Sequence, residues 1–138
     1  MMGSTRRGRR YVDVVVAPFD DAMRGPCQKV AASLRGAGFS VDAALASCKA
    51  RKAFDLANRQ GARLVAFVAP EEWKRGAVRV KDMLVKDPTK AEPEGLQVDV
   101  PLAELGDLAG ALERAALEKG AAWQPLRGAP AKFSALSI

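Results

Sequence analysis

The stretch Tyr11–Val16 reads YVDVVV, and it is followed by FSVDAAL at Phe39–Leu45 and RLVAFV at Arg63–Val68. Runs of β-branched residues, and alternation of apolar with polar residues, are typical of buried strands. The two intervening segments, from Gln28 to Ala37 and from Lys49 to Gln60, repeat apolar residues at helical spacing. Strands that alternate with helices of this length predict a βαβαβ core in which the three strands run parallel.

The second half of the chain departs from this rhythm. Gly76–Met83 (GAVRVKDM) and Leu96–Val100 (LQVDV) alternate as a fourth and a fifth strand. Between them, Lys86–Gly95 is polar and holds two prolines, which predicts a surface hairpin or loop. The sequence of Ala69–Glu72 (APEE) predicts a turn after the third strand. The expected fold is therefore α/β, with three layers (α/β/α) around a mixed five-stranded sheet.

A C-terminal helix is predicted to begin at Pro101, because proline suits the first position of a helix. The apolar stripe expected along this helix consists of Leu102, Leu105, Leu108, Leu112 and Leu117. The chain thus divides into a basic N-terminal arm (1–10), an α/β domain (11–119) and a C-terminal tail (120–138) without periodicity. This tail is expected to wrap the surface or to be disordered.

Composition excludes several kinds of site. The 138 residues, 49% of them apolar, suffice for one domain with a core of its own. Histidine is absent, and Cys27 and Cys48 do not form a CxxC pair, so we expect no zinc site, no other metal and no cofactor. The sequence shows no glycine-rich phosphate loop, no Ser/His/Asp set and no acidic metal cluster, which predicts that the protein is not an enzyme.

Charge favours an anionic partner. The 22 Lys and Arg residues against 16 Asp and Glu give a net charge of +6, and the isoelectric point is about 9.7. The apolar stretches are too short to span a bilayer, and the arm lacks the apolar core of a secretory signal. We expect an intracellular protein, cytoplasmic or mitochondrial. The arm is either the stub of a mitochondrial presequence or a solvated basic segment.

Several stretches, in this order, carry a resemblance to a known family. They are VDVVVAPF at 12–19, AASLRGAGFSVD at 31–42, KARKAFDLANRQGARLVAFV at 49–68, EEWKRGAVRVKDM at 71–83 and VDVPLAELGDL at 98–108. Over about residues 11 to 117 the chain resembles the anticodon-binding domain of class II aminoacyl-tRNA synthetases, of the histidyl type. The family usually has glycine where Ala69 stands. A synthetase catalytic domain needs several hundred further residues, so we expect a binding domain standing alone.

The candidate site lies where ligands bind open parallel sheets, at the carboxyl ends of the strands. Pro18 and Phe19 end the first strand there and offer an apolar platform for RNA bases, unless Phe19 folds back onto the core. Glu72 can accept a hydrogen bond from an exocyclic amine, and Lys81 can donate to a base carbonyl or a phosphate. The resemblance implies that this pair lies beside the anticodon bases. The alternative is an ordinary ion pair across a solvated hairpin.

Phosphate contacts are expected at the start of the second helix. Lys49, Arg51 and Lys52 gather there, although the N-terminus of a helix already carries partial positive charge. A solvated helix face is the alternative. Non-specific phosphate contacts are also expected from four arginines of the arm, namely Arg6, Arg7, Arg9 and Arg10.

The leading hypothesis is a non-catalytic RNA-binding domain. Its partner would be tRNA, or rRNA in a ribonucleoprotein such as a mitochondrial ribosome, with a larger protein complex as a further partner and no membrane. One alternative is a dimerisation or protein-interaction module of the same fold, using the leucine-rich helix and Trp123, with Trp73 as a second anchor. The other is a C-terminal fragment of a histidyl-type synthetase.

Overall fold

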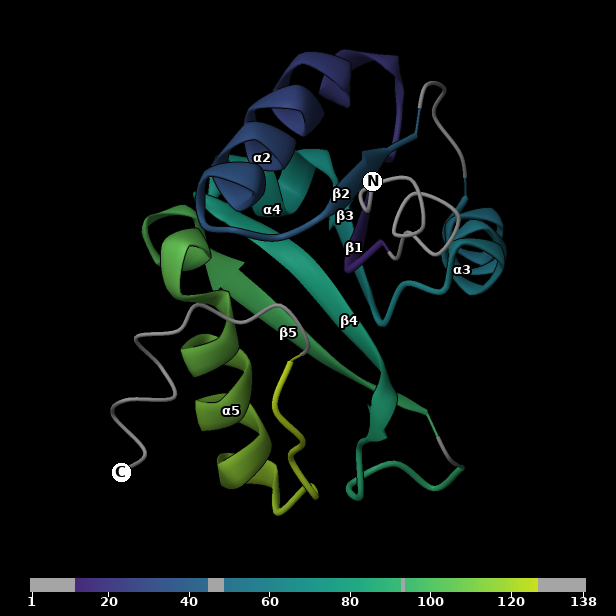
Figure 1. The fold of residues 1–138 in the computed structure, drawn as a ribbon, viewed down its shortest axis with the longest axis vertical. Coiled ribbons are helices and arrows are strands. Elements are labelled where there is room, and N and C mark those ends of the chain that lie inside the picture. The colour runs from purple at the N-terminus through teal and green to yellow at the C-terminus, as the bar shows by residue number, and fades with distance from the viewer. Residues whose placement is uncertain (1–11, 45–48, 93, 127–138) are drawn as a thin grey trace, which may run out of the picture.

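A five-stranded mixed sheet forms the centre of the molecule in the computed structural model, which describes residues 12–44, 49–92 and 94–126 (Figure 1). The strands are β1 (Val14–Pro18), β2 (Val41–Ala43), β3 (Leu64–Val68), β4 (Ala77–Lys86) and β5 (Gly95–Pro101). The helices are α2 (Arg24–Gly36), α3 (Ala50–Gln60), α4 (Pro70–Lys74) and α5 (Leu108–Lys119). Two 3₁₀ helices are η1 (Asp21–Met23) and η2 (Leu102–Asp107).

The topology confirms the predicted βαβαβ core. The strand order is β2-β1-β3-β4-β5, and β1 pairs in parallel with both β2 and β3. The remaining two strands run antiparallel, β4 against β3 and β5 against β4, which makes the sheet mixed as expected. Each parallel crossover carries a helix, because parallel neighbours cannot be joined by a tight turn.

Helices cover both faces of the sheet and form the predicted three layers. Val14 and Val16 of β1 face α2, η2 and α5, whereas Val15 and Ala17 face α3, because successive side chains of a strand point to opposite faces. All four residues are fully buried. In Figure 1, α2 and α5 lie to the left of the sheet and α3 to the right.

Several predicted boundaries were wrong. The first helix begins at Arg24 rather than Gln28, since Pro26 sits in the first turn, where a helix tolerates proline. The second strand extends only over Val41–Ala43. The predicted turn at Ala69–Glu72 is instead the start of the short helix α4, with Pro70 in its first turn.

The C-terminal helix also differs from its prediction. Pro101 is the last residue of β5, and η2 lies between β5 and α5. The helix is interrupted between η2 and α5 because Asp107 has a non-helical backbone (φ −126°, ψ 51°). Leu117, expected on the apolar stripe, is 67% exposed. Four residues after Leu112, the inward position belongs to Ala116, and the next residue therefore turns to solvent.

The segment after α5 turns back along the molecule. Arg63 donates hydrogen bonds to the carbonyl oxygens of Gln124 (2.7 Å) and Pro125 (2.8 Å), and Leu126 is buried in the core. Residues 121–126 thus follow the surface, whereas 127–138 lie outside the described residues, as do the arm and Cys48. Cys27 is buried. Over the described part of the chain, no helix has the length and apolar character needed to cross a membrane.

Candidate nucleic-acid interface

One edge of the sheet brings together the expected platform residues. Pro18 is buried at the end of β1, while the next residue, Phe19, is 52% exposed. The Phe19 ring meets Phe67 of β3 edge to face, with ring centres 6.0 Å apart. Phe19 therefore rests against the sheet yet keeps half of its surface open to a ligand.

The alternative interpretation of Glu72 and Lys81, an ion pair with each other across the hairpin, was wrong, whereas their contact with RNA bases stays a prediction. Glu72, which is buried on α4, pairs with Arg79 (3.1 Å) and Arg75 (3.6 Å). Lys81 instead pairs with Glu94 (3.5 Å), and its ammonium group lies 5.0 Å from the ring centre of Phe54.

The geometry of β4 explains this exchange of partners. Arg79 and Lys81 lie on the same face of β4, two residues apart. Because α4 leads into the beginning of β4, Arg79 is the nearer of the two to Glu72. Lys81 falls one step further along the strand, beside α3 and the hairpin loop.

Asp99 completes the charge arrangement beside Glu72. Its carboxylate accepts two hydrogen bonds from Arg79 (2.8 and 3.2 Å) and one from Arg75 (3.4 Å). The hydrogen bond from Arg79 holds the pKa of Asp99 below its ordinary value, against the opposing effect of burial. The same hydrogen bond raises the pKa of Arg79. Both groups therefore stay charged near neutral pH.

The cations predicted to bind phosphate lie at the start of α3. Lys49 is its N-cap residue, and Lys49, Arg51 and Lys52 are all exposed. Among the described residues, none of the three takes part in an ion pair. In a parallel crossover the helix begins where the preceding strand ends, so these cations lie at the same edge as Phe19. The arm arginines Arg6, Arg7, Arg9 and Arg10 lie outside the described residues.

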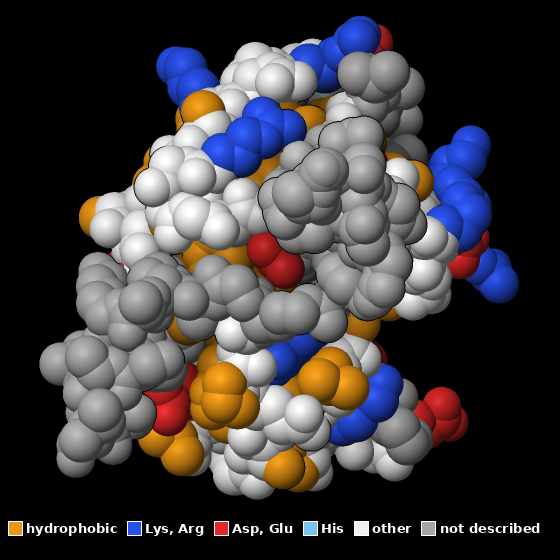
Figure 2. Space-filling view, in the orientation of Figure 1, with side chains coloured by type: hydrophobic (Ala, Val, Ile, Leu, Met, Phe, Trp, Pro, Cys, Tyr) orange, Lys and Arg blue, Asp and Glu red, His pale blue; other side chains and the backbone are white. Residues whose placement is uncertain are grey.

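The opposite edge of the sheet holds a cavity of about 440 Å³. Its lining includes Asp13, Leu64 and Met83 and, from the segment after α5, Gln124–Leu126. Arg63 lies in its wall, between the Asp82 carboxylate (2.8 Å) and the ring of Trp123 (5.1 Å). On the face of the molecule drawn in Figure 2, hydrophobic side chains gather beside Lys and Arg in the lower half.

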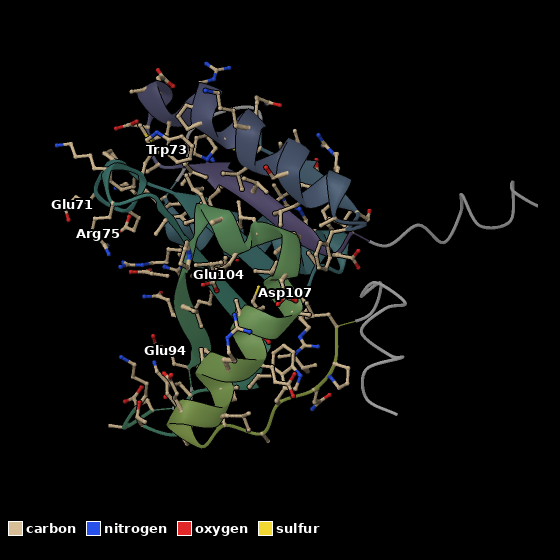
Figure 3. The ribbon with its side chains drawn as sticks, turned by 90° about the vertical axis from the view of Figure 1, so that its left-hand side faces the viewer. Glu71, Trp73, Arg75, Glu94, Glu104 and Asp107 are labelled. Atoms are coloured by element: carbon tan, nitrogen blue, oxygen red, sulfur yellow. The ribbon has the colours of Figure 1, made fainter. Side chains whose placement is uncertain are left out.

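Both tryptophans contact the protein's own core. Trp73 and Trp123 are partly buried and pack against the main core. Figure 3 shows Trp73 directed inward, toward α2, whereas Glu71 and Arg75 of the same region point outward. In the part of the chain that the structure describes, no three His, Cys, Asp or Glu residues come close enough to hold a metal ion.

Sequence reasoning missed three residues of this edge, namely Arg75, Arg79 and Asp99. Alternation along the fourth strand was visible, and it places Arg79 on the face of Lys81. The pairing with Asp99 needed the register of β5 against β4, which no sequence pattern specified.

Comparison with known proteins identifies the fold at the level of a family. The sequence model of one family, described as "Anticodon binding domain", matches residues 13–110. The chain belongs to this family. The resemblance expected from the sequence is thus confirmed.

Curated relatives of this domain include two histidine–tRNA ligases. The chain is 37% identical to the enzyme of Pyrococcus abyssi over 90 residues, which is 65% of this chain and 19% of the relative. It is 32% identical to that of Corynebacterium urealyticum over 103 residues, 75% of this chain and 22% of the relative. The chain therefore spans about a fifth of the length of these relatives.

Solved structures agree with this assignment. The histidyl-tRNA synthetase of Nostoc sp. PCC 7120 superposes with a TM-score of 0.61 at 27% identity, over 72% of this chain and 22% of that one. The RNA-binding domain of threonyl-tRNA synthetase from Cryptosporidium parvum gives a TM-score of 0.57 at 13% identity, over 70% of this chain and 22% of that one, and shares the fold alone.

Proposed function

We propose that this domain binds tRNA without catalysing a reaction of its own. The observation that carries the proposal is the match of residues 13–110 to the anticodon-binding domain family, with histidine–tRNA ligases as relatives. Its matched region corresponds to about a fifth of those enzymes. Accordingly, the contribution assigned to this domain is RNA binding, and the protein that contains it works inside the cell, in the cytoplasm or in a mitochondrion.

The chemistry of the carboxyl edge supports this assignment. Phe19 offers an exposed aromatic face on which an unpaired base can stack. Lys49, Arg51 and Lys52 supply positive charge for the backbone phosphates. Pro18 is the buried last residue of β1, directly before Phe19. Lys81 is a further possible donor, two residues along β4 from Arg79. A domain within a histidyl-type synthetase and a separate accessory domain would both use this surface, and so would a domain bound to rRNA in a ribonucleoprotein.

The salt dependence of tRNA binding tests the proposal. The affinity of labelled tRNA, followed by fluorescence anisotropy, should fall steeply as salt rises, because each phosphate contact releases counterions. The slope of log affinity against log salt is negative. Replacement of Lys49, Arg51 and Lys52 by Ala should reduce its magnitude by roughly two, at about 0.7–0.9 per lost contact. Size-exclusion chromatography with light scattering, run on the same samples, tests the alternative of a dimerisation module.

A second triple variant provides the control. Arg59, Lys86 and Lys90 are exposed cations at the far end of α3 and on the hairpin, and their replacement by Ala removes the same total charge. This control should keep most of the slope. The proposal fails if tRNA does not bind at low salt, or if the two triple variants lose equal slope.

A further inference from the structure

The cavity at the amino edge of the sheet, where β1 and β3 begin, is built from segments far apart in the sequence. Asp13 directly precedes β1, Leu64 begins β3, and Met83 and Leu84 come from β4. The end of α3 and residues 124–126 complete the wall. In Figure 1 the latter belong to the yellow segment that returns from the end of α5. The volume, about 440 Å³, falls in the range of small-molecule sites, roughly 300–1,000 Å³.

Apolar side chains predominate in the lining of this cavity. Phe39, Leu64 and Leu126 are buried members of the main core. Met83 packs against the hydrophobic cluster beneath α3, and Leu84 is 50% exposed. A ligand that displaces water from these side chains gains from the burial of apolar surface. The body of the ligand is therefore expected to be apolar.

Arg63 also lines the cavity, but its guanidinium group is already paired. It donates two hydrogen bonds to the Asp82 carboxylate (2.8 and 3.0 Å). It donates two more, to the carbonyl oxygens of Gln124 (2.7 Å) and Pro125 (2.8 Å). Four of its five N–H donors are thus occupied, and the carboxylate compensates its charge. A phosphate or carboxylate ligand would have to compete with these partners, so the cavity does not suit an anion.

Asp13 gives the lining an uncompensated negative charge. One of its carboxylate oxygens accepts a hydrogen bond from the backbone amide of Ser40 (2.8 Å). This partner is neutral, and Asp13 belongs to no ion pair among the described residues. A carboxylate offers about four acceptor sites, so Asp13 can accept further hydrogen bonds. The polar end of the ligand is therefore expected to be a cationic donor.

We propose that the amino-edge cavity binds a small amphipathic amine, an organic cation with an aromatic or aliphatic body. The ammonium group lies at Asp13, and the body lies against Leu64, Leu84 and Leu126. An ammonium group supplies three N–H donors, which match the remaining acceptor sites of the carboxylate. The cavity lies at the edge of the sheet opposite Phe19, so this site is separate from the proposed RNA surface and does not depend on it.

Three probes that differ only in their end group test the proposal. Phenylbutylamine is a cation at pH 7, phenylbutanol is neutral and phenylbutyrate is an anion. Each is titrated into nitrogen-15-labelled protein, and the backbone amide shifts of Gly61, Ala62 and Leu84 report binding inside the cavity. The amine should bind about two- to fivefold more tightly than the alcohol, as expected for a partly exposed ion pair, and the acid should bind most weakly. The net charge of +6 alone favours the opposite order.

Asp13→Asn tests the contribution of the charge. Asparagine keeps an acceptor for the Ser40 amide, whereas the negative charge is lost. The amine should then bind no more tightly than the alcohol. Asp42→Asn is the matched control, because Asp42 is also partly buried and lies in the neighbouring strand β2, outside the lining. This control should keep the preference for the amine.

Leu84→Gln tests the apolar wall. It replaces an exposed side chain of the lining, so we expect the fold to persist, and thermal melts check this. All three probes should bind at least about threefold more weakly, since part of the surface that their phenyl group covers becomes polar. Leu117→Gln makes the same change on α5, where the leucine is 67% exposed and lies outside the lining. It should leave every affinity unchanged.

Each outcome either supports the site or overturns it. The proposal falls if none of the probes shifts the cavity amides at millimolar concentration, or if the acid binds as tightly as the amine. It falls also if Asp13→Asn keeps the preference for the amine, or if Leu84→Gln binds the probes as tightly as the natural protein does. None of these experiments contains RNA, so their failure leaves the proposed tRNA binding untouched.

Discussion

At the scale of single residues, Arg63 is the side chain whose loss we expect to cost the most. It forms two hydrogen bonds to the fully buried Asp82 (2.8 and 3.0 Å) and stacks on Trp123. Arg63→Ala leaves a buried carboxylate without its counterion, so the free energy of unfolding should fall by about 3–5 kcal/mol. Urea unfolding measures this change.

An exposed arginine makes the comparison. Arg114→Ala breaks two ion pairs in solvent, with Glu104 and Asp107, and should cost about 0–1 kcal/mol. If Arg63→Ala unfolds as easily as Arg114→Ala, the remaining partners of Asp82 (the backbone amides of Leu84 and Val85) suffice to stabilise its charge.

The residue scale is also where prediction from sequence reached its limit. Residue types at the carboxyl edge could be read directly, so Phe19, Glu72 and Lys81 were singled out. Which charges would meet was decided by distances of a few ångströms, and these depend on α4 and on the β4–β5 register. The pairing of Glu72 with Arg79 rather than Lys81 follows from that geometry.

At the scale of elements, Asp87 joins the β4–β5 loop to the end of α5. Its carboxylate accepts hydrogen bonds from the hydroxyl and amide of Thr89 (2.6 and 2.9 Å) and from the ammonium group of Lys119 (3.1 Å). The Thr89 hydroxyl is the largest of several causes that lower the pKa of Asp87 from 3.8 to about 2. Between these values the unfolded chain binds the proton more readily than the folded one.

This linkage predicts a specific pH dependence. The ionised Asp87 stabilises the fold fully above pH 3.8, and this contribution disappears as the pH falls to about 2. The difference in urea midpoint between the natural protein and Asp87→Asn should therefore be constant above pH 4. It should shrink as the pH falls toward 2. Asp55→Asn, at an exposed position of α3, is the control for general charge effects. A gap that stays constant down to pH 2 contradicts the prediction.

Elements were easier to predict than their ends. Periodicity identified the five strands and the helices α2, α3 and α5, because burial on one or two faces leaves a pattern in the sequence. Short segments leave too few residues for a pattern. The five-residue helix α4 was therefore taken for a turn, and the 3₁₀ turns of η2 were merged with α5.

At the scale of the whole molecule, the two edges of the sheet differ in what they carry. The carboxyl edge carries the proposed RNA site, and the amino edge carries the cavity that Gln124–Leu126 help to line. Parallel strands with intervening helices were predictable from the sequence, whereas the use of the carboxyl edge by RNA stays a prediction. The course of residues 121–126 was not predictable, since it depends on carbonyl groups of Gln124 and Pro125 that any residue possesses.

Truncation tests whether the two edges are independent. A chain that ends at Gly120 loses the buried Leu126, the Trp123 ring and the acceptors of Arg63, whereas one that ends at Leu126 keeps them. Burial of one leucine alone contributes about 1.5–3 kcal/mol, so the shorter chain should unfold at a clearly lower temperature. Below that temperature the two chains should bind tRNA with equal affinity, because the lost contacts lie at the end of α3 and not near Phe19 or the start of α3. Equal melting temperatures would mean that the segment adds nothing to the fold, and weaker binding by the shorter chain would mean that the edges are coupled.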